Sequence, residues 1–154
     1  MNFTAFLITI SICLISLIIA GKAAKPEDWE WFVNLNHPDN AFMVKIMNIL
    51  GLIFFGLYGF ALYQLMNTSN YVSEILVAIM ILFMAVGPVI KYKTKNLKKI
   101  AFTFVLYPIV NTILVITLFN SNQLLFWLIN AYGIWLIYDV SYYFRLIKLN
   151  PQAD

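Results

Sequence analysis

The class of fold is decided by one stretch of the chain, ILVAIMILFM at residues 75–84. It is apolar without interruption, whereas a strand of a membrane β-barrel alternates apolar and polar residues over about 10 positions. In lipid, a helix satisfies all the backbone hydrogen bonds of such a run within one segment. The surrounding segment, residues 71–90, is long enough to cross a hydrocarbon core of about 30 Å. This stretch therefore predicts a transmembrane helix.

Four further segments have the same apolar character, at residues 3–20, 41–65, 100–119 and 124–147. The 154-residue chain is 62% hydrophobic and only 11% charged, whereas a soluble globular domain is about 25% charged. No lysine or arginine precedes the first segment, so we expect it to be a retained helix and not a signal peptide. We predict a single all-α membrane domain, residues 1–154, built as a bundle of five transmembrane helices.

The basic residues all fall on one side of this topology. They are Lys22, Lys25 and Lys45 near the first loop, Lys91, Lys93, Lys95, Lys98 and Lys99 near the third, and Arg145 and Lys148 near the C-terminus. The positive-inside rule then places the N-terminus outside and the C-terminus in the cytoplasm. Such lysines suit anionic lipid headgroups, so we expect a lipid membrane and no nucleic acid as partner. The lack of an arginine-rich presequence favours a bacterial inner membrane.

Residue combinations that carry out chemistry are nearly absent. The chain has one histidine, His37, and one cysteine, Cys13, so neither a disulfide nor a cysteine metal site forms within one chain. We interpret His37 as a turn residue and Cys13 as a packing residue of the first helix. We therefore predict no catalytic residue, no metal ligand and no enzyme activity.

Asp139 is the sharpest anomaly, because it lies within the fifth apolar segment. A charge deep in lipid costs at least about 2.5 kcal/mol, so such residues normally face the interior of a bundle. Helical spacing places Trp135, Tyr138, Asp139 and Tyr142 on one face. Two interpretations stay open. In the first, Asp139 is the one acid in an aromatic wall. In the second, Asp139 lies near the cytoplasmic end of the helix, where it pairs with a lysine or snorkels to the polar headgroup layer.

The first loop carries a stretch that is unusual for a connector, WFVNLNHP at residues 31–38. It resembles the first-loop signature of the translocator protein family, also called tryptophan-rich sensory proteins or peripheral-type benzodiazepine receptors. The matching residues are Trp31, Phe32, Leu35 and Pro38, with His37 where a basic residue is common.

Two other segments carry the same resemblance. In the second helix, Gly59 and Ala61 match a glycine-x-alanine pattern, and Phe55 matches an aromatic position before it. In the fifth helix, the spacing of Tyr132, Trp135, Leu149 and Asn150 is similar to that of the family. The chain departs from the family at Gly51, where the family has a pocket tryptophan, and at Asp139, where it has a small residue. Segments three and four carry no such match.

The resemblance implies a five-helix bundle with a pocket under the first loop, in which the family binds tetrapyrroles, cholesterol and aromatic drug-like compounds. Trp31, Phe32, Leu35 and Pro38 would belong to the lid, and Trp135, Tyr138, Asp139 and Tyr142 to the wall. Phe55 and Gly59 are the candidate ligand-binding residues of the second helix. We expect a receptor, sensor or carrier of a hydrophobic aromatic ligand such as a tetrapyrrole or sterol. A porphyrin or haem would be its ligand and not a catalytic cofactor.

Two other classes of function compete with this interpretation. The scarcity of polar groups and the many aromatic residues also suit an accessory or assembly subunit of a larger membrane complex, with no ligand of its own. A small transporter would need more polar residues or broken helices at the membrane midplane. The expected protein partners are accordingly a second copy of the chain or other membrane subunits.

Overall fold

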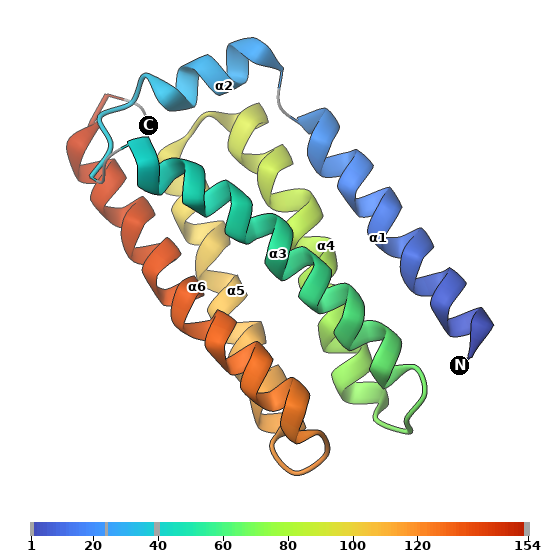
Figure 1. The fold of residues 1–154 in the computed structure, drawn as a ribbon. Helices are drawn as coiled ribbons and strands as arrows, with labels where there is room; N and C mark the ends of the chain where they lie inside the picture. Colours follow the sequence, from blue (N-terminus) through green and yellow to red (C-terminus); the bar gives the residue numbers. More distant parts are fainter. Residues whose placement is uncertain (1, 24, 39–40, 153–154) are drawn as a thin grey trace.

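The computed structural model describes residues 2–23, 25–38 and 41–152, and the side chains of residues 41–45 and 47–48 lie outside that description. Within these ranges the chain forms six helices and no strand. They are α1 (Phe3–Ala23), α2 (Pro26–Val33), α3 (Ala41–Leu65), α4 (Tyr71–Thr94), α5 (Leu97–Leu118) and α6 (Gln123–Leu149). The long helices α1, α3, α4, α5 and α6 run side by side, and α2 lies across one end of the bundle (Figure 1).

Four of the long helices, α1, α4, α5 and α6, are apolar and long enough to cross a membrane. The apolar part of α3 that the structure describes is shorter and covers Ile49–Leu65. Many large apolar side chains of the long helices point outward, as lipid contact requires. The chain is therefore an all-α integral membrane protein.

The helices extend beyond the segments predicted at the end where α2 lies. α4 continues from residue 90 to Thr94, and α5 begins at Leu97, so the expected lysine loop is a tight turn. Lys95 ends α4 in the left-handed conformation, with φ 49°. The side chain of Asn96 then caps α5 by accepting a hydrogen bond from the backbone N–H of Lys99, at 2.8 Å. Long lysine side chains tolerate helical positions at a membrane edge, because their charged ends reach the polar layer.

The first loop also differs from the prediction, because it contains α2. Pro26 occupies the first turn of this helix, where its missing N–H costs nothing. The carboxylate of Asp28 accepts a hydrogen bond from the backbone N–H of Lys25 at 3.1 Å. Glu27 and Asp28 place negative charge at the N-terminal end of the helix, where its dipole favours it.

The long helices pack around one another through apolar and aromatic side chains. α5 packs closely against α4 and α6, and α1 packs against α4 and α3. α3 meets α6 through aromatic side chains, with the ring centroids of Phe54 and Tyr132 4.1 Å apart. In the middle of the bundle, the hydroxyl of Tyr58 donates a hydrogen bond to the side chain of Asn111. Asn111 in turn donates to the backbone carbonyl of Ile129, at 3.3 Å. This buried network joins α3, α5 and α6.

Candidate functional site

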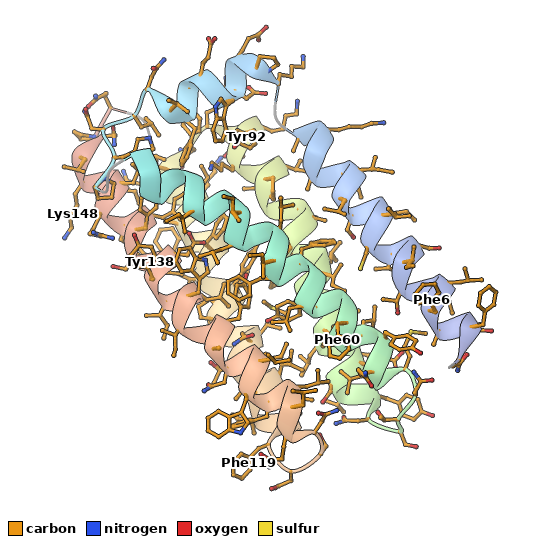
Figure 2. The ribbon with its side chains drawn as sticks, viewed as in Figure 1. Phe6, Phe60, Tyr92, Phe119, Tyr138 and Lys148 are labelled. Atoms are coloured by element: carbon orange, nitrogen blue, oxygen red, sulfur yellow. The ribbon has the colours of Figure 1, made fainter. Side chains whose placement is uncertain are left out.

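A cavity of about 250 Å³ lies inside the bundle, in the half nearer to α2. Its lining comes from all six helices that the structure describes: Leu17, Ala20, Phe32, Gly51, Leu52, Phe55, Met84, Pro88, Lys91, Tyr92, Phe104, Tyr107, Tyr132, Trp135, Asp139 and Tyr143. Figure 2 shows Tyr92 at the end that α2 covers, whereas Phe119 marks the opposite end. Eight of these residues are aromatic, so the cavity offers flat faces on which a ring would stack.

Two charged side chains line this otherwise apolar and aromatic space, Lys91 from α4 and Asp139 from α6. Lys91 is only 8% exposed. Its ammonium nitrogen lies 3.2 Å from the centroid of the Phe32 ring and 5.0 Å from that of Tyr92. These are cation–π contacts, which the quadrupole of an aromatic ring makes favourable.

Lys91 and Asp139 carry opposite charges in the lining of the same cavity, and no ion pair between them is found. In the part of the chain that the structure describes, the one ion pair is between Lys95 and Asp28. No hydrogen bond of either the Lys91 ammonium or the Asp139 carboxylate is found among those residues. The cavity therefore presents three N–H donors at one point and a carboxylate acceptor at another.

α2 covers this cavity and is held to the end of α4. Phe32, which is 3% exposed, points from α2 into the lining. One ion pair joins the two helices, with Lys95 Nζ 2.9 Å from Asp28 Oδ1. The hydrogen bond from Lys95, followed by the one from the Lys25 backbone, lowers the pKa of Asp28 below its ordinary value. The Asp28 carboxylate is therefore charged and in this form holds α2, the cover of the cavity, to the end of α4.

The segment after α2 is held to α6 by two sets of hydrogen bonds. His37 contacts the backbone carbonyl of Phe32 through Nε2, at 2.9 Å, and the hydroxyl of Tyr142 through Nδ1. The side chain of Asn150 accepts from the backbone N–H of Asn36 and donates to its carbonyl, both at 2.9 Å. His37 is thus more than a turn residue, because it links the cover to α6.

Of the ten predicted ligand-binding residues, the structure brings Phe32, Phe55, Trp135 and Asp139 to the cavity. Trp135 and Asp139 are four residues apart on α6 and so lie one above the other.

The other six predicted residues lie outside the lining: Trp31, Leu35, Pro38, Gly59, Tyr138 and Tyr142. Trp31 and Leu35 pack on the apolar cluster around Phe32 and Tyr142, and Pro38 is half-buried after α2. Gly59 lies against Cys13 of α1, where an added Cβ would come within 2.9 Å of the sulfur. Tyr138 packs against Trp135, with the ring centroids 5.0 Å apart, and is not itself part of the lining.

Sequence reasoning missed Lys91, because it grouped this lysine with the basic residues of the third loop. Met84, Pro88, Lys91 and Tyr92 recur at the three- and four-residue spacing of one helix face. Extending the helical pattern to the turn at Lys95 would have placed Lys91 on that face. Gly51 was recognised as a departure from the family, and it does line the cavity with open space at its Cβ position.

Among the residues the structure describes, no three histidine, cysteine, aspartate or glutamate side chains gather as a metal site. No family model, curated protein or solved structure matches the chain. The resemblance to translocator proteins therefore stays a prediction that rests on the residues quoted for it.

Proposed function

We propose that this protein is a membrane receptor, sensor or carrier that binds a small aromatic ligand in the cavity beneath α2. One observation carries the proposal: a cavity of about 250 Å³ has an aromatic lining that includes Phe32 of α2. Ligand sites typically combine mostly apolar walls with a few polar groups. The partial match of residues 31–38 to the translocator family supports the same interpretation.

We propose a topology of five transmembrane segments, with α3 as the fifth. Lys22, the lysines at residues 91–99, Arg145 and Lys148 belong to the ends of α1, α4, α5 and α6 that lie beside α2 (Figure 1). By the positive-inside rule this end faces the cytoplasm, and the N-terminus lies outside. A bacterial inner membrane is the location that we propose.

The size of the cavity narrows the choice of ligand. Sites for drug-sized ligands usually measure about 300–1,000 Å³, whereas this cavity measures about 250 Å³. A compound with one or two fused rings fits without rearrangement. A tetrapyrrole or sterol would require the residues around the cavity to rearrange.

The proposal is tested by titrating the purified protein in lipid nanodiscs with haem, protoporphyrin, cholesterol and 3-methylindole, using calorimetry. Trp135→Ala removes an aromatic face of the cavity and should weaken binding. Trp127→Ala is the matched control, since Trp127 lies on the same helix, is 64% exposed and does not line the cavity.

Saturable binding that Trp135→Ala weakens and Trp127→Ala does not would support the proposal. The absence of saturable binding by every probe, or equal effects of the two substitutions, would overturn it. An unlike subunit that co-purifies in fixed ratio, together with no binding, would instead favour the accessory-subunit interpretation.

A further inference from the structure

We infer that the cavity selects an aromatic zwitterion, a compound whose ring carries both a carboxylate and an ammonium group on a short chain. In this arrangement Lys91 binds the carboxylate and Asp139 binds the ammonium. The inference rests on the proposed function, because it names the chemical class of ligand for the same cavity.

Lys91 is almost fully buried, and its ammonium nitrogen faces the rings of Phe32 and Tyr92. A ring face attracts the charge but accepts N–H groups only weakly, so the three donors keep their need for an oxygen. These two rings are the partners of the ammonium group that are found among the described residues. A ligand carboxylate fits this position, because it is a charged acceptor.

Asp139 is the acidic residue among the described lining residues. Of the tyrosine hydroxyls in the same lining, that of Tyr107 donates to the backbone carbonyl of Phe83. A carboxylate is an acceptor only, and it binds charged donors more strongly than neutral ones. A ligand ammonium would satisfy both its charge and its hydrogen-bonding capacity.

The two charges of the cavity balance each other. Lys91 and Asp139 line the same cavity with opposite charges but do not form an ion pair. A ligand with one charge would leave the other protein charge without a partner, which is costly in an apolar space. A zwitterion makes two opposite-charge contacts and leaves the filled cavity neutral. Its ring would stack near Trp135, one turn of α6 from Asp139.

Four probes separate the contributions, since all carry the same indole ring. Tryptophan has both charges, indole-3-propionate lacks the ammonium, tryptamine lacks the carboxylate, and 3-methylindole lacks both. We expect tryptophan to bind about tenfold or more tightly than each of the others, as measured by calorimetry in nanodiscs, because hydrogen bonds to charged groups are strong.

Substitutions in the protein complete the experiment. Lys91→Met should abolish the preference for tryptophan over tryptamine, and Lys91→Arg should keep it, because arginine retains charge and donors. Asp139→Asn should abolish the preference for tryptophan over indole-3-propionate. Thermal denaturation of each variant checks that it is folded, and the Lys91→Arg variant provides the test if Lys91→Met does not fold.

The outcomes distinguish a failure of the zwitterion inference from a failure of the proposed function. Equal affinities for all four probes, or preferences that both substitutions leave unchanged, would overturn the zwitterion inference while aromatic binding stands. This result is expected if Lys91 and Asp139 only stabilise the fold and do not bind the ligand. If no probe binds, and haem, protoporphyrin and cholesterol also fail, the proposed function itself fails.

Discussion

The ammonium nitrogen of Lys91 lies 3.2 Å from the centroid of the Phe32 ring, so a charge of the cavity directly touches the helix that covers it. The second connection between α2 and α4 is the ion pair of Asp28 and Lys95, one turn further along α4. A ligand that binds Lys91 therefore meets the cover through the same side chain. The cover and the cavity therefore form one physical unit.

Removing the Phe32 ring should loosen the cover. Phe32→Ala deletes a buried aromatic side chain and the cation–π partner of Lys91. We expect the protein to lose about 3–5 kcal/mol of stability, seen as a lower midpoint of thermal denaturation in detergent. Val33→Ala is the matched control, because Val33 is the next residue of α2 and is 47% exposed. A similar loss in both variants would contradict this account of the cover.

Acid should release the cover from α4. The folded pKa of Asp28 is held below its ordinary value of 3.8, mainly by the hydrogen bond from Lys95. The contribution of the charged carboxylate is therefore fully present above pH 3.8 and is lost as the pH falls through the lowered folded pKa. Hydrogen exchange at α2, corrected for intrinsic rates, should become faster in that window.

The substitution Asp28→Asn provides the comparison for this pH effect. It removes the charge at every pH, so α2 should exchange fast at neutral pH and show no further step in acid. Glu27→Gln is the control, because Glu27 is exposed in the same first turn. An unchanged acid step in Asp28→Asn would assign the effect to another group.

The long helices could be predicted from the sequence, because a long apolar run such as residues 75–84 by itself indicates a transmembrane helix. α2 could not, since an eight-residue helix is unstable alone and forms here by packing Phe32 and pairing Asp28 with α4. Its proline and acidic first turn were visible, but no local pattern says what the helix packs against.

Part of the candidate site could be predicted, because two of its residues lie on one helix. Helical spacing and a charge in lipid led to Trp135 and Asp139, which share one face of a single helix. Lys91 lies on another helix, and its approach to Asp139 depends on how α4 and α6 pack around α5. The sequence alone therefore does not show that Lys91 and Asp139 line the same cavity.

Removing the side-chain amide of Asn150 should free the segment that follows α2. Asn150→Ala leaves the backbone N–H and carbonyl of Asn36 without their partner. A lost partner of this kind costs about 1–3 kcal/mol when the groups stay buried. We expect faster proteolysis between α2 and α3, while Asn120→Ala, an exposed change at the opposite end, leaves the rate unchanged. Equal rates in both variants would argue against this hydrogen-bonded connection.

A methyl group at Gly87 should close part of the cavity. The Cβ of Gly87→Ala would overlap the hydroxyl of Tyr107, which donates to the carbonyl of Phe83 and lines the cavity. The Tyr107 ring is stacked on Phe104, with centroids 4.9 Å apart, so it moves only by disturbing a second lining residue. We expect binding of 3-methylindole to weaken about tenfold, because the displaced Tyr107 ring takes up space that the ligand needs. The overpacking itself lowers the stability of the fold, typically by about 1–3 kcal/mol.

Gly56→Ala is the control for this change, because Gly56 is exposed on α3 and an added Cβ meets nothing within 4 Å. Alanine favours a helix over glycine by about 1 kcal/mol, so this variant should be as stable as the parent protein or more stable. Unchanged ligand affinity in Gly87→Ala, with a normal denaturation midpoint, would mean that the ligand does not occupy the space beside Tyr107. Weakened affinity in Gly87→Ala alone would place the ligand against that ring.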